Sequence, residues 1–256
     1  MRRSSNPVFR SLEKQQVVVT VDGATTLGVA TKTIVLLLLT LVSAALSVVF
    51  GLQAVAVPGG GVQFAIQPWL IVVIALSLIT AFFSVLIASF FPRVAMPFSI
   101  LYSLGQGATL GTITAIINFF IPGAAITALI GIGSVFAVML LLYTSKAFRV
   151  TNKFRRFMIG TLIAIVVASL FSGILQLVAP GLGIFNNLPL AIILTIVLII
   201  FGAFMLMLDF DYADQIVQAG LPTNYEWVAA LGFMVTLVWI YVQILRLIIL
   251  LASRRD

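Results

Sequence analysis

Three aspartates within six residues are the side chains of this 256-residue sequence that are best suited to chemistry. Asp209, Asp211 and Asp214 stand in the segment LMLDFDYADQIV, directly after a long apolar run, and they are three of the seven acidic residues. Carboxylate oxygens are ligands that hard cations such as Ca²⁺ prefer. The segment therefore predicts a cation site, with Asp209, Asp211 and Asp214 as ion-gate or pore candidates and Asp209 and Asp211 as candidate metal ligands.

Helical geometry separates these three side chains. At about 100° per residue, Asp209 and Asp211 point about 200° apart, whereas Asp211 and Asp214 are only about 60° apart. The three carboxylates cannot all line one cavity. Asp209 lies deepest in the apolar run, has the largest desolvation cost and is the preferred pore-side acid. The alternative is a solvated acidic helix end that pairs with the basic segment 146–156.

Composition excludes a soluble enzyme. Hydrophobic residues make up 62% of the chain and charged residues 8%, against about 25% charged residues in ordinary soluble domains. A helix needs about 20 mostly apolar residues to cross a bilayer, so the chain has material for about seven spans and little else. We expect an all-α polytopic membrane protein, a seven-transmembrane-helix bundle embedded in the lipid bilayer.

The expected spans follow one another along the chain, separated by Gly, Pro or charged residues. They cover residues 33–57, 69–91, 95–120, 124–143, 157–178, 188–208 and 227–251. Together they make one transmembrane domain over 32–253. A polar tail over 1–31 precedes it and shows no signal-peptide pattern, so we interpret it as cytoplasmic.

Basic residues divide unevenly between the two sides of this bundle. All 14 Lys and Arg, except Arg246, Arg254 and Arg255, precede the first span or fall in loops after even-numbered spans. Because excess Lys and Arg mark cytoplasmic loops, we expect a plasma-membrane protein with a cytoplasmic N-terminus. The same rule accounts for the net charge of +7 without a nucleic-acid partner. Seven spans place the three remaining arginines outside, and a re-entrant last segment would place them inside.

The residues on which most membrane enzymes depend are missing. The chain has no His and no Cys, which excludes imidazole bases, thiolate nucleophiles and metal sites built on them. The last lysine, Lys153, precedes the fifth span, so a retinal Schiff base in the last span is excluded. We expect no enzymatic activity and no cofactor, apart from Ca²⁺ as a transported or bound ion.

The third span combines small residues with one amide. The spacing of Gly107 and Gly111, with Gly105 close by, allows helix backbones to approach each other closely and predicts helix packing. Gln106 lies among these glycines, needs a polar partner in hydrocarbon and is a further pore candidate.

Arg93 is the candidate counter-ion for Asp209. It follows the second span and lies on the same side of the membrane as the three aspartates. A charge-assisted bond between Arg93 and Asp209 would exist only while the carboxylate is ionised. Protonation would break that bond, so this arrangement predicts a flux that rises as the pH falls.

Five segments along the chain carry a family resemblance. In order they are NPVFRSLEK, FPRVAMPFSILYSLGQGATLG, RVTNKFRR, LDFDYADQIVQAG and EWVAALGFMVTLVWIYVQILRLI. Together they resemble the bacterial Bax inhibitor-1/YccA family, in its branch with an extended N-terminal tail. The resemblance implies a seven-helix bundle with a central last helix, and a pH-sensitive Ca²⁺ leak gated by aspartates in the sixth and seventh spans.

Only one of the two gate aspartates has a counterpart in this sequence. Asp209, eleven residues before Gly220, matches the position of the aspartate in the sixth span. The position in the seventh span falls near Thr236, which is not acidic, so the gate has one acid here.

Three functional hypotheses follow. The first is a passive cation leak, for Ca²⁺ in particular. The second is a non-conducting regulator that binds another membrane protein, such as a membrane protease, through residues 1–31. The third is a stress-related bundle without a defined ligand.

Overall fold

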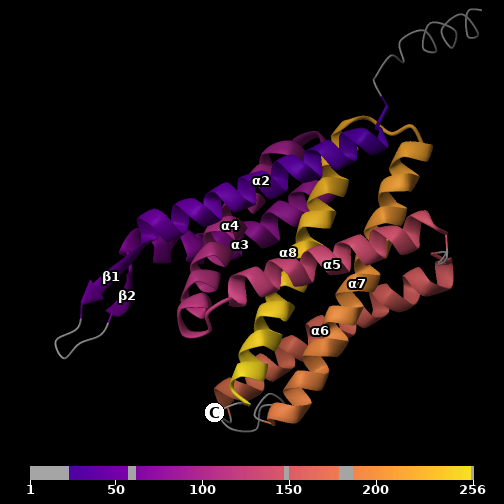
Figure 1. Cartoon of the computed structure of the whole chain (residues 1–256). Helices are drawn as coiled ribbons and strands as arrows, with labels where there is room; N and C mark the ends of the chain where they lie inside the picture. Colours follow the sequence, from indigo (N-terminus) through magenta and orange to yellow (C-terminus); the bar gives the residue numbers. More distant parts are fainter. Residues whose placement is uncertain (1–22, 57–61, 147–149, 179–186, 255–256) are drawn as a thin grey trace, which may run out of the picture.

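Seven long helices make up most of the computed structural model, which describes residues 23–56, 62–146, 150–178 and 187–254. Each of the seven is long and apolar enough to cross a membrane, which confirms the predicted all-α bundle. Figure 1 shows their arrangement, with labels that begin at α2. The helices are α2 (Thr26–Gly51), α3 (Pro68–Phe90), α4 (Ala95–Phe120), α5 (Ala124–Thr144), α6 (Asn152–Val178), α7 (Leu188–Gln218) and α8 (Asn224–Ala252).

The first helix is shifted toward the N-terminus relative to the predicted span over 33–57. It begins at Thr26 because the Thr25 hydroxyl caps it by accepting a hydrogen bond from the backbone N–H of Gly28 at 2.9 Å. It ends at Gly51, where an antiparallel hairpin of β1 (Leu52–Ala56) and β2 (Val62–Ile66) begins. Hydrogen bonds between the strands satisfy the backbone beyond the last helical turn, so the predicted continuation of the span to residue 57 is wrong. Gly59, Gly60 and Gly61 lie outside the described residues.

Two other helices extend beyond their predicted ends. Helix α6 begins at Asn152 instead of 157, and α7 runs to Gln218 instead of ending at 208. The 31 residues of α7 span about 46 Å, more than the roughly 30 Å of bilayer hydrocarbon. The helix therefore continues past the apolar layer, and the acidic segment is part of it.

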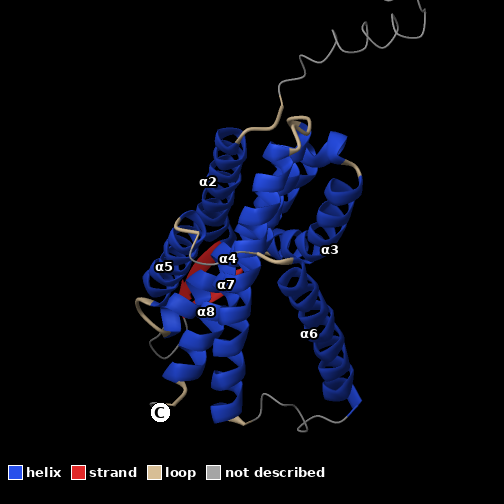
Figure 2. Ribbon diagram, turned by 90° about the vertical axis from the view of Figure 1, so that its right-hand side faces the viewer, coloured by secondary structure: helices blue, strands red, loops and turns tan. Residues whose placement is uncertain are grey.

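Helix α8 lies at the centre of the bundle and packs against α2, α4, α5 and α7 (Figures 1 and 2). Its apolar side chains are buried toward several neighbours at once, as the family resemblance implies for the last helix. The buried ones are Val228, Ala229, Ala230, Leu231, Phe233, Met234, Leu237, Ile240, Ile244 and Leu245. We call the end of the bundle where α2 and α8 begin the basic end, and the other end the opposite end.

Helix α6 is the most loosely attached of the seven. Figure 2 shows it diverging from the other helices. It is held to α7 close to the basic end, where Arg155 pairs with Asp211 and the rings of Phe154 and Phe204 lie 5.8 Å apart. Most of its large apolar side chains are exposed in the isolated chain. In a bilayer such side chains contact lipid.

Candidate cation site at Asp209

The three aspartates lie on one continuous helix and face three different neighbours. The carboxylate of Asp211 forms an ion pair with Arg155 of α6 and accepts a hydrogen bond from Nε2 of Gln215 at 2.6 Å. Asp214 accepts a hydrogen bond from the hydroxyl of Tyr143 on α5. Asp209 faces Gly232 and Thr236 of α8. The structure therefore does not bring the three carboxylates to one cavity.

Asp209 is half-buried between α7 and α8. Its carboxylate lies close to the side chain of Thr236, and Oδ1 lies 3.7 Å from where a Cβ atom would stand on Gly232. Oδ2 is buried without a hydrogen-bond partner among the described residues. Asp209 lies nine residues before the end of α7 at Gln218, which is about 14 Å along the helix axis. Among the three aspartates, this acid is thus the farthest from the end of α7.

Two further polar groups without a hydrogen-bond partner lie on α8, the helix that Asp209 faces. Nε1 of Trp239 and Oε1 of Gln243 are buried and have no hydrogen-bond partner in the described residues. Thr236 and Gln243 are seven residues apart, so they lie on one face of the helix. Buried polar atoms are normally satisfied, and exceptions need a water, an ion or a function to explain them. The interface of α7 and α8 therefore contains buried polar atoms that have no hydrogen-bond partner among the described residues.

Arg93 does not form the bond expected from the sequence. It is exposed in the short 3₁₀ helix η1 (Pro92–Val94) between α3 and α4. The described residues contain two ion pairs, Lys32 with Glu226 and Arg155 with Asp211, and neither includes Arg93 or Asp209. Basic-residue counting gives the side of the membrane but not the depth. Arg93 stands at the end of the bundle, whereas Asp209 lies about two and a half turns inside α7.

Asp209 and Asp211 are not placed as joint ligands of one metal ion. Asp211 is committed to Arg155 and Gln215 on α6 and α7, whereas Asp209 faces Thr236 on α8. Within the described ranges, no three Asp, Glu, His or Cys side chains gather as a metal cluster. A cation at Asp209 would depend on one carboxylate together with hydroxyl, amide or water oxygens.

A buried ion pair at the basic end was missed by the sequence reasoning. Glu226, in the first turn of α8, is only 4% exposed and pairs with Lys32 of α2. It also accepts a hydrogen bond from the backbone N–H of Thr25 at 2.7 Å, and Nζ of Lys32 donates to the Thr223 carbonyl at 3.0 Å. Lys32 precedes the predicted first span and Glu226 precedes the predicted last span, so their places at the same end of the bundle are the signal that could have found them.

The glycines of α4 lie at helix crossings. A Cβ on Gly107 would overlap the carbonyl oxygen of Thr40, and one on Gly111 would come 2.6 Å from Cα of Ala44, both on α2. Gly105 instead faces Ser77 of α3, 2.8 Å from its Cβ. These glycines therefore stand where α4 approaches α2 and α3 closely. Gln106, between them, is buried at 9% exposure.

The central position of α8 and the acid of α7 that faces it are the arrangement that the sequence resemblance implies. The family model described as Bax inhibitor 1 like matches residues 6–253, nearly the whole chain. The chain belongs to the Bax inhibitor 1 like family. Among curated proteins, no individual match was found.

Family membership gives Thr236 a specific meaning. The resemblance to Bax inhibitor proteins implies a second acid near this position, and here the residue next to Asp209 is Thr236 itself. The structure thus places a neutral hydroxyl opposite the acid of α7. At this contact between α7 and α8, the chain has one carboxylate where the resemblance implies two.

Proposed function

We propose that this Bax inhibitor 1 like protein is a passive cation leak of the plasma membrane, for Ca²⁺ in particular, and that Asp209 is its pore-side acid. The observation that carries the proposal is the carboxylate of Asp209, whose buried Oδ2 has no partner among the described residues. An ionised carboxylate in apolar surroundings is costly unless a cation, a donor or water compensates it. A permeating cation can supply that compensation.

Neutral oxygens along α8 support the same path. The Thr236 hydroxyl contacts Asp209, and Oε1 of Gln243 is unpartnered about two turns further along α8. Hard cations accept carboxylate, hydroxyl, amide and water oxygens together. A single negative charge followed by neutral oxygens attracts a cation without holding it too tightly for release.

The pH dependence follows from the missing Arg93 bond. Protonation cannot break a bond that the structure does not form, so the expectation of a flux that rises as the pH falls loses its basis. Asp209 attracts a cation only while it is ionised. We therefore expect the flux to fall when the pH is lowered enough to protonate Asp209.

Purified protein in liposomes tests the proposal. Ca²⁺ flux into the liposomes should fall about tenfold or more in Asp209→Asn, which corresponds to losing at least 1.4 kcal/mol of interaction with the ion. The matched control is Asp211→Asn, which removes the same kind of charge two residues away but outside the buried site. Its flux should stay near that of the wild type. Equal flux in wild type and Asp209→Asn would contradict the proposal.

Orientation gives a separate prediction. We propose that the basic end is cytoplasmic and the C-terminus external, because excess Lys and Arg mark cytoplasmic loops. The chain has no native Cys, so single cysteines can be labelled without background. In intact cells, a membrane-impermeant maleimide should label Ser253→Cys, and it should label Asn152→Cys only after permeabilisation. External labelling at position 152 would contradict this orientation.

The regulator hypothesis remains the alternative, and one observation favours it. The backbone N–H of Ala24 donates to the Leu221 carbonyl at 2.7 Å, so the chain that leads into α2 is anchored beside the turn between α7 and α8. The regulator hypothesis places the contact with a partner in the segment that leads into this anchored point; residues 1–22 of that segment lie outside the described part. Absence of flux in all variants, together with a membrane protein that co-purifies only when the tail is present, would support this function instead.

A further inference from the structure

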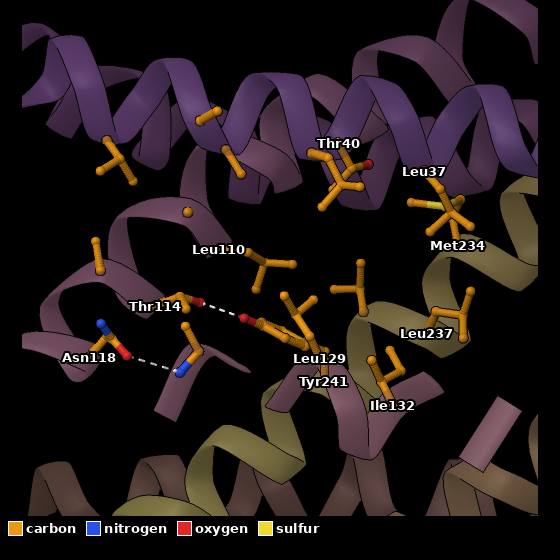
Figure 3. A pocket seen from close by; sticks show the side chains of 18 of the residues that line it. Leu37, Thr40, Leu110, Thr114, Asn118, Leu129, Ile132, Met234, Leu237 and Tyr241 are labelled. Atoms are coloured by element: carbon orange, nitrogen blue, oxygen red, sulfur yellow. Dashed lines mark hydrogen bonds between the residues drawn. The ribbon is translucent and has the colours of Figure 1, made fainter. Parts of the chain in front are cut away.

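A long apolar cavity lies on the side of α8 that is lined by Met234, Leu237 and Val238, away from the Asp209 site. It measures about 640 Å³ and is bounded by α2, α4, α5 and α8. Figure 3 shows Leu37 and Thr40 of α2, Leu110 of α4, and Leu129 and Ile132 of α5 around it. This volume is in the range of ligand pockets, about 300–1,000 Å³.

The cavity opens toward the lipid. Three of its lining side chains are largely exposed in the isolated chain, Leu41 and Val49 of α2 at 54% and 68% and Leu129 of α5 at 50%. The floor is closed by α8, where Met234 and Leu237 are 1% and 6% exposed. The cavity is therefore a recess in the lipid-facing surface, continuous with the apolar layer that surrounds the helices.

The polar side chains in the cavity already form hydrogen bonds within the protein. The hydroxyls of Thr114 and Tyr241 bond to each other at 2.9 Å, and the Thr40 hydroxyl donates to the Leu36 carbonyl at 2.9 Å. Oδ1 of Asn118 accepts from the backbone N–H groups of Gly123 and Ala125 at 3.1 and 3.2 Å. A polar ligand or water would find few free partners here, whereas an alkyl chain needs none.

The length of the cavity fits one leaflet. Its lining on α2 extends from Leu37 to Val49, twelve residues or about 18 Å along the axis. Half of the bilayer hydrocarbon is about 15 Å thick. The cavity ends near Asn118, two residues before the end of α4 at the opposite end of the bundle.

We propose that this cavity binds one acyl chain of a bilayer phospholipid, which enters between α2 and α5 from the leaflet at the opposite end and lies against α8. The inference rests on the cavity and its lipid-facing mouth, and it does not depend on the cation-leak proposal. The bound chain fills a space that the helices leave open and supports α8 from the side away from Asp209.

Photo-crosslinking of the full chain tests the proposal. The probe is a phosphatidylcholine with a diazirine in one acyl chain, mixed into liposomes that contain the purified protein. We expect labelled peptides to include the cavity floor, at Met234, Leu237 or Tyr241, besides the exposed surface of α3 at Phe82 and Phe83. Labelling confined to exposed residues, with none on the floor, would overturn the proposal.

Cavity-filling variants sharpen the test. Ala45 is exposed and lines the mouth, so Ala45→Phe should fill it without disturbing helix packing. Ala115→Phe fills the cavity from α4 as a second variant. Both should lose the label on α8 and keep the label on α3. The matched control is Ala75→Phe on the exposed face of α3, which should leave α8 labelled. Unchanged α8 labelling in both filled variants would contradict a lipid chain as occupant.

Discussion

Replacing Lys32 by Met is expected to lower the free energy of unfolding by about 3 kcal/mol, at the lower end of what removing one partner of a buried ion pair costs. Glu226 is 4% exposed and would keep its charge without its cation. The remaining backbone donor, the N–H of Thr25, cannot replace the ammonium group. Thermal unfolding of the purified protein in detergent measures the effect.

Lys153→Met is the matched control for this prediction. Lys153 is an exposed basic residue at the same end of the bundle, and exposed substitutions usually change stability by less than about 0.5 kcal/mol. The double variant with Lys32→Met and Glu226→Gln should recover part of the loss, since the buried charge is then gone. Equal melting temperatures for Lys32→Met and Lys153→Met would show that the pair contributes nothing to stability.

Replacing Thr236 by Asp is expected to raise the preference for Ca²⁺ over Na⁺ about tenfold or more. The side chain at this position lies next to Asp209, so the variant places two carboxylates side by side. At an effective dielectric constant of 20, each added unit charge interacts with a charge 4 Å away by about 4 kcal/mol, and a divalent ion gains twice as much as a monovalent one. Parallel Ca²⁺ and Na⁺ flux assays in liposomes measure this preference.

The same variant should also change the shape of the pH dependence. Two adjacent carboxylates lose their protons in two coupled steps, so the flux should vary over a wider pH range than in the wild type. Thr236→Asn, which is polar and neutral, is the control and should keep the selectivity of the wild type. If Thr236→Asp and Thr236→Asn behave alike in both assays, position 236 does not face the permeating ion.

The apolar runs predicted the bundle correctly because crossing a bilayer requires long apolar helices. The ends of the helices were less predictable. Apolar content shows which part of a helix lies in hydrocarbon, but α7 continues ten residues beyond its predicted end at 208, past Asp209 and on through Asp211 and Asp214 toward the basic end. The hairpin after Gly51 was also missed, since a short apolar segment can form either a helix or a strand.

The candidate site was also predicted only in part. Helical geometry separated Asp209 from Asp211 and Asp214, and the structure directs the three side chains toward α8, α6 and α5. The predicted partner of Asp209, Arg93, was wrong. Counting basic residues assigns Arg93 to the correct end of the bundle, but depth depends on how the helices pack, and no local pattern encodes that. For the same reason, the ion pair of Lys32 and Glu226 was not predicted.

The role of Asp209 is tested most directly by the Ca²⁺ flux of the wild type and Asp209→Asn in liposomes as the pH is lowered stepwise from the alkaline side. We expect wild-type flux to fall as Asp209 is protonated, and Asp209→Asn to give a low flux that does not change with pH. A wild-type flux that rises as the pH falls, or an Asp209→Asn variant that retains the pH dependence of the wild type, would contradict the role of Asp209 as the cation-attracting acid.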